Sequence, residues 1–138
     1  PASPPRALVI GQPLVSSGLM TADDAASLGA EIAAWLAEQG IEEVHYKAHP
    51  KDPRRGLLQS NYHVIELEQP LETWMSTQHY DIVVGVRSSA LLFAAQIYES
   101  DARVVAFGWD RVTFESEQEQ RAMASAFRAC GVEIFGYR

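Results

Sequence analysis

The chain has 138 residues, 47% of them hydrophobic and 21% charged, which is typical of one globular domain and not of a disordered or fibrous protein. Its 11 Lys and Arg against 18 Asp and Glu give a net charge of -7, the wrong sign for a protein that neutralises nucleic-acid phosphates. No apolar run reaches the ~18 residues that span a bilayer, and the single cysteine, Cys130, excludes an intrachain disulfide and favours a reducing compartment. We therefore expect no nucleic-acid partner and no transmembrane segment.

The first residues, Pro1-Ala2-Ser3-Pro4-Pro5, have the composition of a linker. We expect a linker or tail at 1–5 and a single Rossmann-like domain at 6–138. Because the sequence also lacks an initiating Met, we expect it to be a domain excised from a longer protein.

Alternating apolar patterns predict strands and helices in turn along the chain. Six β-rich runs predict strands at Arg6–Ile10, Glu43–Ala48, His63–Leu67, Tyr80–Val86, Arg103–Phe107 and Val132–Phe135. Apolar residues at three-to-four spacing predict helices from Thr21 to Gly40, from Pro70 through Trp74, from Ala90 to Tyr98 and from Ser116 to Gly131. The fourth run is apolar almost throughout, which favours a central strand covered on both faces. This order predicts an α/β fold, a Rossmann-like three-layer domain with a mostly parallel sheet of about six strands.

Polar side chains follow several predicted strands, where ligands bind in such sheets. The candidates are Gly11 and Gln12, His49 and Pro50, and Arg87, Ser88 and Ser89. Positive charge gathers near two of these strand ends, at Lys47, Lys51, Arg54, Arg55 and Arg87. The cluster indicates either an anion site or a solvated loop.

Three of these features have a functional and a structural interpretation. Ser88 and Ser89 precede a helix, where hydroxyls and free N–H groups bind phosphate or simply cap the helix. His49 is held at the sheet edge by Pro50 and either contacts a phosphate and protonates a leaving group or is incidental. Glu72, near a helix start, either accepts ribose hydroxyls or interacts with the helix dipole.

No metal or common cofactor motif is found. His45 and His49 lie on one face of a strand but four residues at about 3.3 Å each place them ~13 Å apart, too far to share an ion. The sequence has no Asp-x-Asp pair, no G-x-x-x-x-G-K-[ST] loop and no G-x-G-x-x-G fingerprint. We expect no metal site and no cofactor.

Lys47-Ala48-His49-Pro50, then Glu72, then Ser88-Ser89 resemble the nucleotide-binding half of bacterial sialyltransferases with the GT-B fold, and within them the bacterial polysialyltransferase family. Those enzymes carry a His-Pro motif and a Ser-Ser or Ser-Thr motif that face CMP-sialic acid. The resemblance covers the architecture from about Leu8 to Gly136, with its motifs between Tyr46 and Ser89. It implies one half of a GT-B glycosyltransferase that transfers sialic acid from CMP-sialic acid to a glycan acceptor.

The resemblance also implies roles for individual residues. His49 would be catalytic, contacting the CMP phosphate and acting as general acid, and Ser88 and Ser89 would bind phosphate oxygens. Lys47 would hold the cytidine and Glu72 the ribose hydroxyls, with Pro50, Gly11 and Gln12 completing the CMP site. The implied enzyme needs no metal, and its location is cytoplasmic, with peripheral attachment of the full-length enzyme to the inner membrane as one option.

The chain departs from the family at the general base. These enzymes take the base from an Asp/Glu-Asp/Glu-Gly motif in an N-terminal domain, and Asp23-Asp24-Ala25 lacks the glycine. We therefore expect the missing N-terminal domain of the same enzyme to be a partner and the isolated chain to be inactive.

Two other functions fit the size and layout. The chain could be a non-catalytic Rossmann-like module that binds a nucleotide or a phosphorylated sugar. A phosphoacceptor receiver domain needs an exposed Asp at a central strand end, where this sequence has His49 and Ser88 instead.

Overall fold

The computed structural model describes residues 4–137, which form one parallel sheet with helices on both faces. The strands are β1 (Arg6–Ile10), β2 (Glu43–Lys47), β3 (His63–Ile65), β4 (Ile82–Gly85), β5 (Arg103–Ala106) and β6 (Glu133–Ile134). The helices are α1 (Ala22–Glu38), α2 (Leu71–Thr77), α3 (Ala90–Tyr98) and α4 (Glu117–Ala129), with a short 3-10 turn at Glu99–Asp101. The predicted α/β architecture is confirmed. Of the predicted tail at 1–5, residues 1–3 lie outside the described part of the chain.

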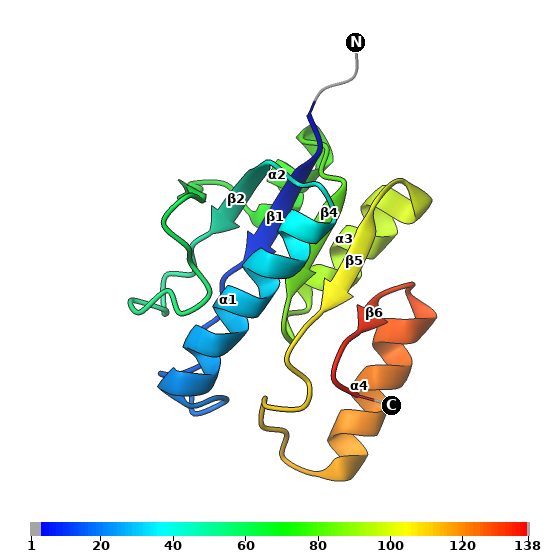
Figure 1. The fold of residues 1–138 in the computed structure, drawn as a ribbon. Coiled ribbons are helices and arrows are strands. Elements are labelled where there is room, and N and C mark those ends of the chain that lie inside the picture. The colour runs from blue at the N-terminus through cyan, green and yellow to red at the C-terminus, as the bar shows by residue number, and fades with distance from the viewer. Residues whose placement is uncertain (1–3, 138) are drawn as a thin grey trace.

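The sheet order is β3-β2-β1-β4-β5-β6, and every neighbouring pair is parallel. This is the order of a doubly wound Rossmann sheet, in which the chain first moves outward from β1 and then returns to add β4 on its other side. In Figure 1, α1 lies in front of the sheet and α2 and α3 lie behind it. The segment between β2 and β3 has no helix and packs against α1, since Gly29 faces the main chain of Gly56 and Leu57.

The centre of the sheet is covered on both faces, as the apolar run at Tyr80–Val86 predicts. The four residues of β4 and the last four of β1 are all buried. A strand inside a parallel sheet has no solvated face, so its side chains are apolar without alternation. The rigid centre fixes the positions of the loops at its carboxyl edge.

The predicted ends of α1 and the predicted start of α4 are confirmed by their caps. The Thr21 hydroxyl accepts from the Asp24 N–H at 3.1 Å, and α1 ends before Gly40, whose φ of +79° suits glycine. The Ser116 hydroxyl accepts from the Glu119 N–H at 3.0 Å. Glu119 completes this capping box one residue earlier than the usual pattern, on the Glu115 N–H at 3.0 Å.

Several strand boundaries were predicted too long. β2 ends at Lys47, β3 at Ile65 and β4 at Gly85, so each stops one or two residues short of its apolar run. The helix opened by Pro70 is longer than predicted and runs to Thr77. Ala48, just after β2, and Glu66 and Leu67, just after β3, line a pocket.

Candidate functional site

The site lies where the strand order reverses, at the carboxyl ends of β1 and β4, with β2 beside them. Gly11 follows β1 so closely against β2 that a Cβ would lie 2.5 Å from the Tyr46 hydroxyl and 2.7 Å from the Lys47 carbonyl. The Gly11 N–H also donates to that carbonyl at 2.9 Å. A side chain at position 11 would clash with β2, so glycine is required for the loop after β1 to run beside the end of that strand.

The structure brings most of the predicted site residues into one pocket of about 400 Å³. The predicted residues that line it are Gly11, Lys47, His49, Pro50, Glu72, Ser88 and Ser89. An adjoining pocket of about 580 Å³ shares Gly11, His49, Ser88 and Ser89 and adds Gln12, Lys51 and Arg87. His49 and the serine pair, 39 positions apart in sequence, therefore face the same crevice from β2 and β4.

His49 is held by a tight turn directly after β2. The Asp52 N–H donates to the His49 carbonyl at 3.0 Å, closing a turn with Pro50 at its second position, where the fixed proline φ fits. Within this turn the Lys51 N–H donates to His49 Nδ1 at 3.1 Å. The ring is thereby fixed by its Nδ1 side.

Asp52 anchors the turn from below. It is 4% exposed, the one buried charged side chain among residues 4–137, and its carboxylate accepts from the Arg55 N–H at 3.2 Å and the Tyr46 hydroxyl at 3.5 Å. Burial, and then the Asp52 charge, raise the pKa of Tyr46, so its hydroxyl stays a donor. Sequence analysis missed Asp52, although Asp-Pro after His-Pro-Lys is a turn signal.

The serine pair occupies the start of α3. Ser88 Oγ accepts from the Ala90 N–H at 3.1 Å and so has a capping role. Ser89 is the N-cap residue, but its side chain makes no capping hydrogen bond and is exposed. The Ser89 hydroxyl is therefore available to a ligand, next to the positive end of a nine-residue helix.

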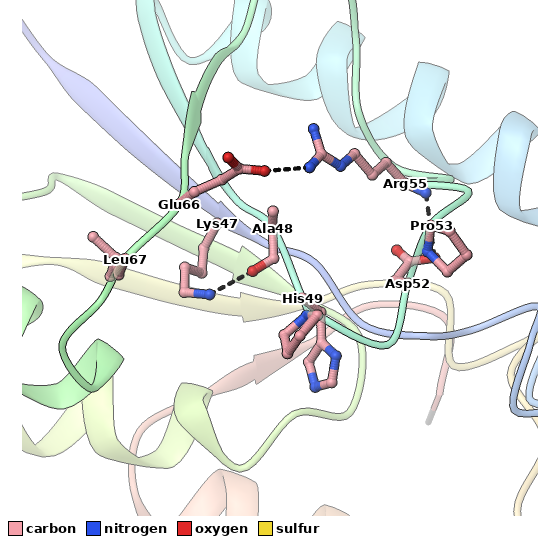
Figure 2. A pocket seen from close by; sticks show the side chains of 9 residues that line it. Lys47, Ala48, His49, Asp52, Pro53, Arg55, Glu66 and Leu67 are labelled. Carbon is pink, nitrogen blue, oxygen red and sulfur yellow. Dashed lines mark hydrogen bonds and ion pairs between the residues drawn. The ribbon is translucent and has the colours of Figure 1, made fainter.

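A third pocket, of about 610 Å³, extends from His49 toward the edge strand β3 (Figure 2). Arg55 and Glu66 form an ion pair across it at 2.6 Å. The Lys47 ammonium donates to the Ala48 carbonyl, and burial lowers the pKa of Lys47 while the nearby Glu66 raises it. Lys47 also lines the pocket of His49 and Ser88, so one cation borders both compartments.

Glu72 and Gln12 line the two adjoining pockets, one each. Glu72 lies in the first turn of α2, exposed, with its residue lining the same pocket as His49. Gln12 Oε1 accepts from the Arg87 N–H at 3.2 Å, which ties the loop after β1 to the loop after β4. Gln12 thus joins the two sides of the switch point.

The predicted cluster of positive charge is only partly available to an anion. The Arg87 guanidinium donates to the Thr113 carbonyl at 2.6 Å, lies 3.5 Å from Glu119 and stacks 4.7 Å over the Phe114 ring. Arg55 is paired with Glu66. These two arginines hold neighbouring loops, a role that strand-end position alone does not reveal.

Among residues 4–137, no three His, Cys, Asp or Glu side chains gather as a metal site would require. Within the same range, no helix combines the length and the apolar character needed to cross a membrane.

Comparison with solved structures shows the fold. The chain superimposes on the nicotinamidase SaPncA from Staphylococcus aureus with a TM-score of 0.53 and 15% identity, covering 96% of this chain and 99% of that one. For a putative MAR1 ribonuclease from Leishmania major the TM-score is 0.58 at 13% identity, covering 96% and 78%. For the pyrazinamidase of Pyrococcus horikoshii, solved with zinc, it is 0.57 at 12% identity, covering 97% and 100%. At these identities the likeness concerns the α/β fold alone.

No curated protein matches the chain. Residues 2–105 match the model of the alpha-2,8-polysialyltransferase family (POLYST). The match covers well over half of the sequence and takes in β1 through α3, the whole region that carries His49, Glu72 and the serine pair. The chain therefore belongs to the alpha-2,8-polysialyltransferase family, a family of sialyltransferases, as the resemblance of its His-Pro and Ser-Ser motifs predicts.

Proposed function

We propose that this chain is the donor-binding domain of a sialyltransferase that transfers sialic acid from CMP-sialic acid to a hydroxyl of a glycan acceptor. The observation that carries the proposal is the single crevice lined by His49, Ser88 and Ser89 at the switch point of a doubly wound sheet. Such crevices are where α/β sheets of this order bind nucleotides.

The crevice offers the CMP phosphate several kinds of donor. His49 supplies a ring N–H, Ser88 and Ser89 supply hydroxyls, and the N-terminus of α3 adds the positive end of its dipole. A phosphate there accepts charge-assisted hydrogen bonds, which are stronger than neutral ones. Because these donors can bind the phosphate without a metal ion, we propose a metal-independent enzyme with no cofactor.

The rest of the nucleotide fits the polar groups along the same pocket. Glu72 has a carboxylate that can accept the two ribose hydroxyls, as an acidic residue does in dinucleotide folds. Lys47 lines both compartments, and we propose that its ammonium donates to the cytosine carbonyl. We propose this placement of CMP, with Gly11, Gln12 and Pro50 shaping its walls.

The 138 residues contain no Asp/Glu-Asp/Glu-Gly tripeptide to supply a general base. Asp23 and Asp24 lie in the first turn of α1, where their carboxylates interact favourably with the helix dipole. We propose that the base and the acceptor site belong to a separate N-terminal domain of a GT-B enzyme. This chain alone then binds the donor without transferring sialic acid.

The test is nucleotide binding, measured as the shift in melting temperature on adding CMP, with UMP as the control nucleotide. CMP is expected to stabilise the chain more than UMP, because a ligand of the folded state alone raises stability by mass action. His49→Ala removes a hydrogen bond to a charged group and is expected to weaken CMP binding roughly 10- to 100-fold. His79→Ala is the matched control, since its side chain is 59% exposed at the opposite end of the sheet and does not line the crevice.

Equal stabilisation by CMP and UMP contradicts the donor assignment. If Ser88→Ala and His49→Ala both leave the CMP shift intact, the crevice is not the nucleotide site. Fusion to an N-terminal domain of the family that restores no transfer, while CMP still binds, favours a non-catalytic nucleotide-binding module.

A further inference from the structure

The hydrogen bond between Lys51 and His49 determines where the ring proton of His49 lies. A main-chain N–H can only donate, so His49 Nδ1, 3.1 Å from the Lys51 nitrogen, must be the acceptor. In a neutral imidazole the other nitrogen then carries the hydrogen. His49 therefore presents Nε2–H to the crevice.

The amide that sets this tautomer is itself firmly held. The Asp52 N–H closes the turn onto the His49 carbonyl at 3.0 Å, and the Ser16 hydroxyl donates to the Lys51 carbonyl at 3.2 Å. Beneath the turn, the buried Asp52 carboxylate accepts from the Arg55 N–H. The peptide group that follows Lys51 is thus held at both its carbonyl and its N–H, which restrains the residue that carries the donor.

We infer that the Lys51 main-chain N–H is a positioning group that selects the Nε2–H tautomer of His49, so that His49 donates a hydrogen bond from Nε2 to the substrate phosphate and keeps its proton. The second half of this inference rests on the proposed function. A doubly protonated ring would place an Nδ1–H against the Lys51 N–H, two donors facing each other. His49 then differs from the general acid that the family resemblance implies.

Donation without proton transfer suits a phosphate leaving group. The second pKa of a phosphate monoester lies near 6, so CMP is mostly a dianion at neutral pH and needs no added proton to leave. Hydrogen bonds from Nε2–H and the serine hydroxyls serve to stabilise the charge that develops on its oxygens.

The first test is the tautomer of His49 in the ligand-free chain, read at pH 7.5 from the ¹H–¹⁵N correlation pattern of ¹⁵N-labelled histidine rings. The chain has four histidines, and the His49→Gln variant identifies the His49 signals by their loss. A neutral Nε2–H pattern is expected, unchanged in Lys51→Ala, which keeps the main-chain donor. An Nδ1–H pattern, or a doubly protonated ring with CMP bound, overturns the inference.

The second test compares two amide replacements by the affinity for CMP. The amide nitrogen of His49→Gln can occupy the place of Nε2, whereas that of His49→Asn reaches only the place of Nδ1. We expect the glutamine variant to bind CMP more tightly than the asparagine variant, although neither can act as an acid. Tighter binding by the asparagine variant contradicts donation from Nε2.

The two tests separate this inference from the proposed function. If CMP does not bind the native chain, the proposed function fails, and the tautomer of the free ring still decides the role of Lys51. If CMP binds and the ring carries its proton on Nδ1, the function stands and the inference falls.

Discussion

Two histidines four positions apart, His45 in β2 and His49 just after it, have contrasting surroundings. In β2, His45 Nδ1 lies 2.7 Å from the Tyr80 hydroxyl and His45 Nε2 lies 2.8 Å from Glu43 Oε2, so both nitrogens are engaged. After β2, His49 has one nitrogen bonded to the Lys51 N–H and its ring lines the crevice. His45 is held within the fold through both nitrogens, whereas His49 is held through Nδ1 alone and lines the crevice.

The difference follows from the neighbours of each residue. His45 pairs in register with Leu8 of β1 and His63 of β3. The His45 ring packs edge-on against the rings of His63 and Tyr80, with centroid distances of 5.8 and 5.4 Å. At His49 the ladder has ended and the strands diverge around pockets. Position relative to the end of the strand, and not residue type, separates a structural histidine from a candidate functional one.

The largest effect on stability is expected from Tyr80→Phe, which removes a hydrogen-bond partner of His45. The Tyr80 hydroxyl accepts from Trp74 Nε1 at 3.1 Å as well as contacting His45, so its loss leaves two partly buried polar groups without a partner. The cost is about 2 kcal/mol of unfolding free energy, measured by urea denaturation. The CMP shift should persist, because Tyr80 does not line the crevice.

The matched control is Tyr62→Phe. Tyr62 is also buried, but its hydroxyl has no hydrogen-bond partner within the described residues, and burial raises its pKa to about 12. Removing an unpaired buried hydroxyl should leave stability unchanged or slightly higher. Equal losses in both variants would show that the bonds to Tyr80 contribute nothing.

The next-largest effects distinguish the roles of the two serines that line the crevice, Ser88 and Ser89. Ser89→Ala should change stability by less than about 0.5 kcal/mol, since this hydroxyl caps nothing, yet weaken CMP binding by a few-fold to about tenfold. Ser88→Ala should also weaken binding, and in addition lose about 1 kcal/mol of stability with its bond to the Ala90 N–H. Urea denaturation and CMP titration of both variants distinguish a cap from a ligand.

Local chemistry made much of the fold and part of the site predictable. Caps such as Thr21 and Ser116 depend on residues three apart, and the apolar run of β4 records burial on both faces. His49 and Ser88 were found because residues after parallel strands meet at one edge of the sheet. Each of these inferences needs only local sequence and one rule of sheet geometry.

The rest depends on contacts between distant segments. Nothing near Arg87 in sequence shows that its guanidinium binds the Thr113 carbonyl, 26 positions away, instead of an anion. Likewise Tyr80 meets His45 across 35 positions. The ring tautomer of His49 depends on the conformation of one turn, which the residues His-Pro-Lys-Asp allow but do not specify.

The smallest effect is a pH dependence that sharpens the comparison of the two histidines. Burial lowers the pKa of His45 from 6.5, and Arg6 and His63 lower it further, against the raising effect of Glu43. The unfolded chain therefore takes up a proton at His45 before the folded chain does, so stability present above pH 6.5 is lost as the pH falls below it. Urea denaturation at pH 7.5 and pH 5.5 should show this loss, and His45→Gln should reduce it because the variant no longer titrates there. His49→Gln should keep the loss in full, because His45 and its partners remain. If the loss instead disappears in His49→Gln and persists in His45→Gln, its assignment to His45 is wrong.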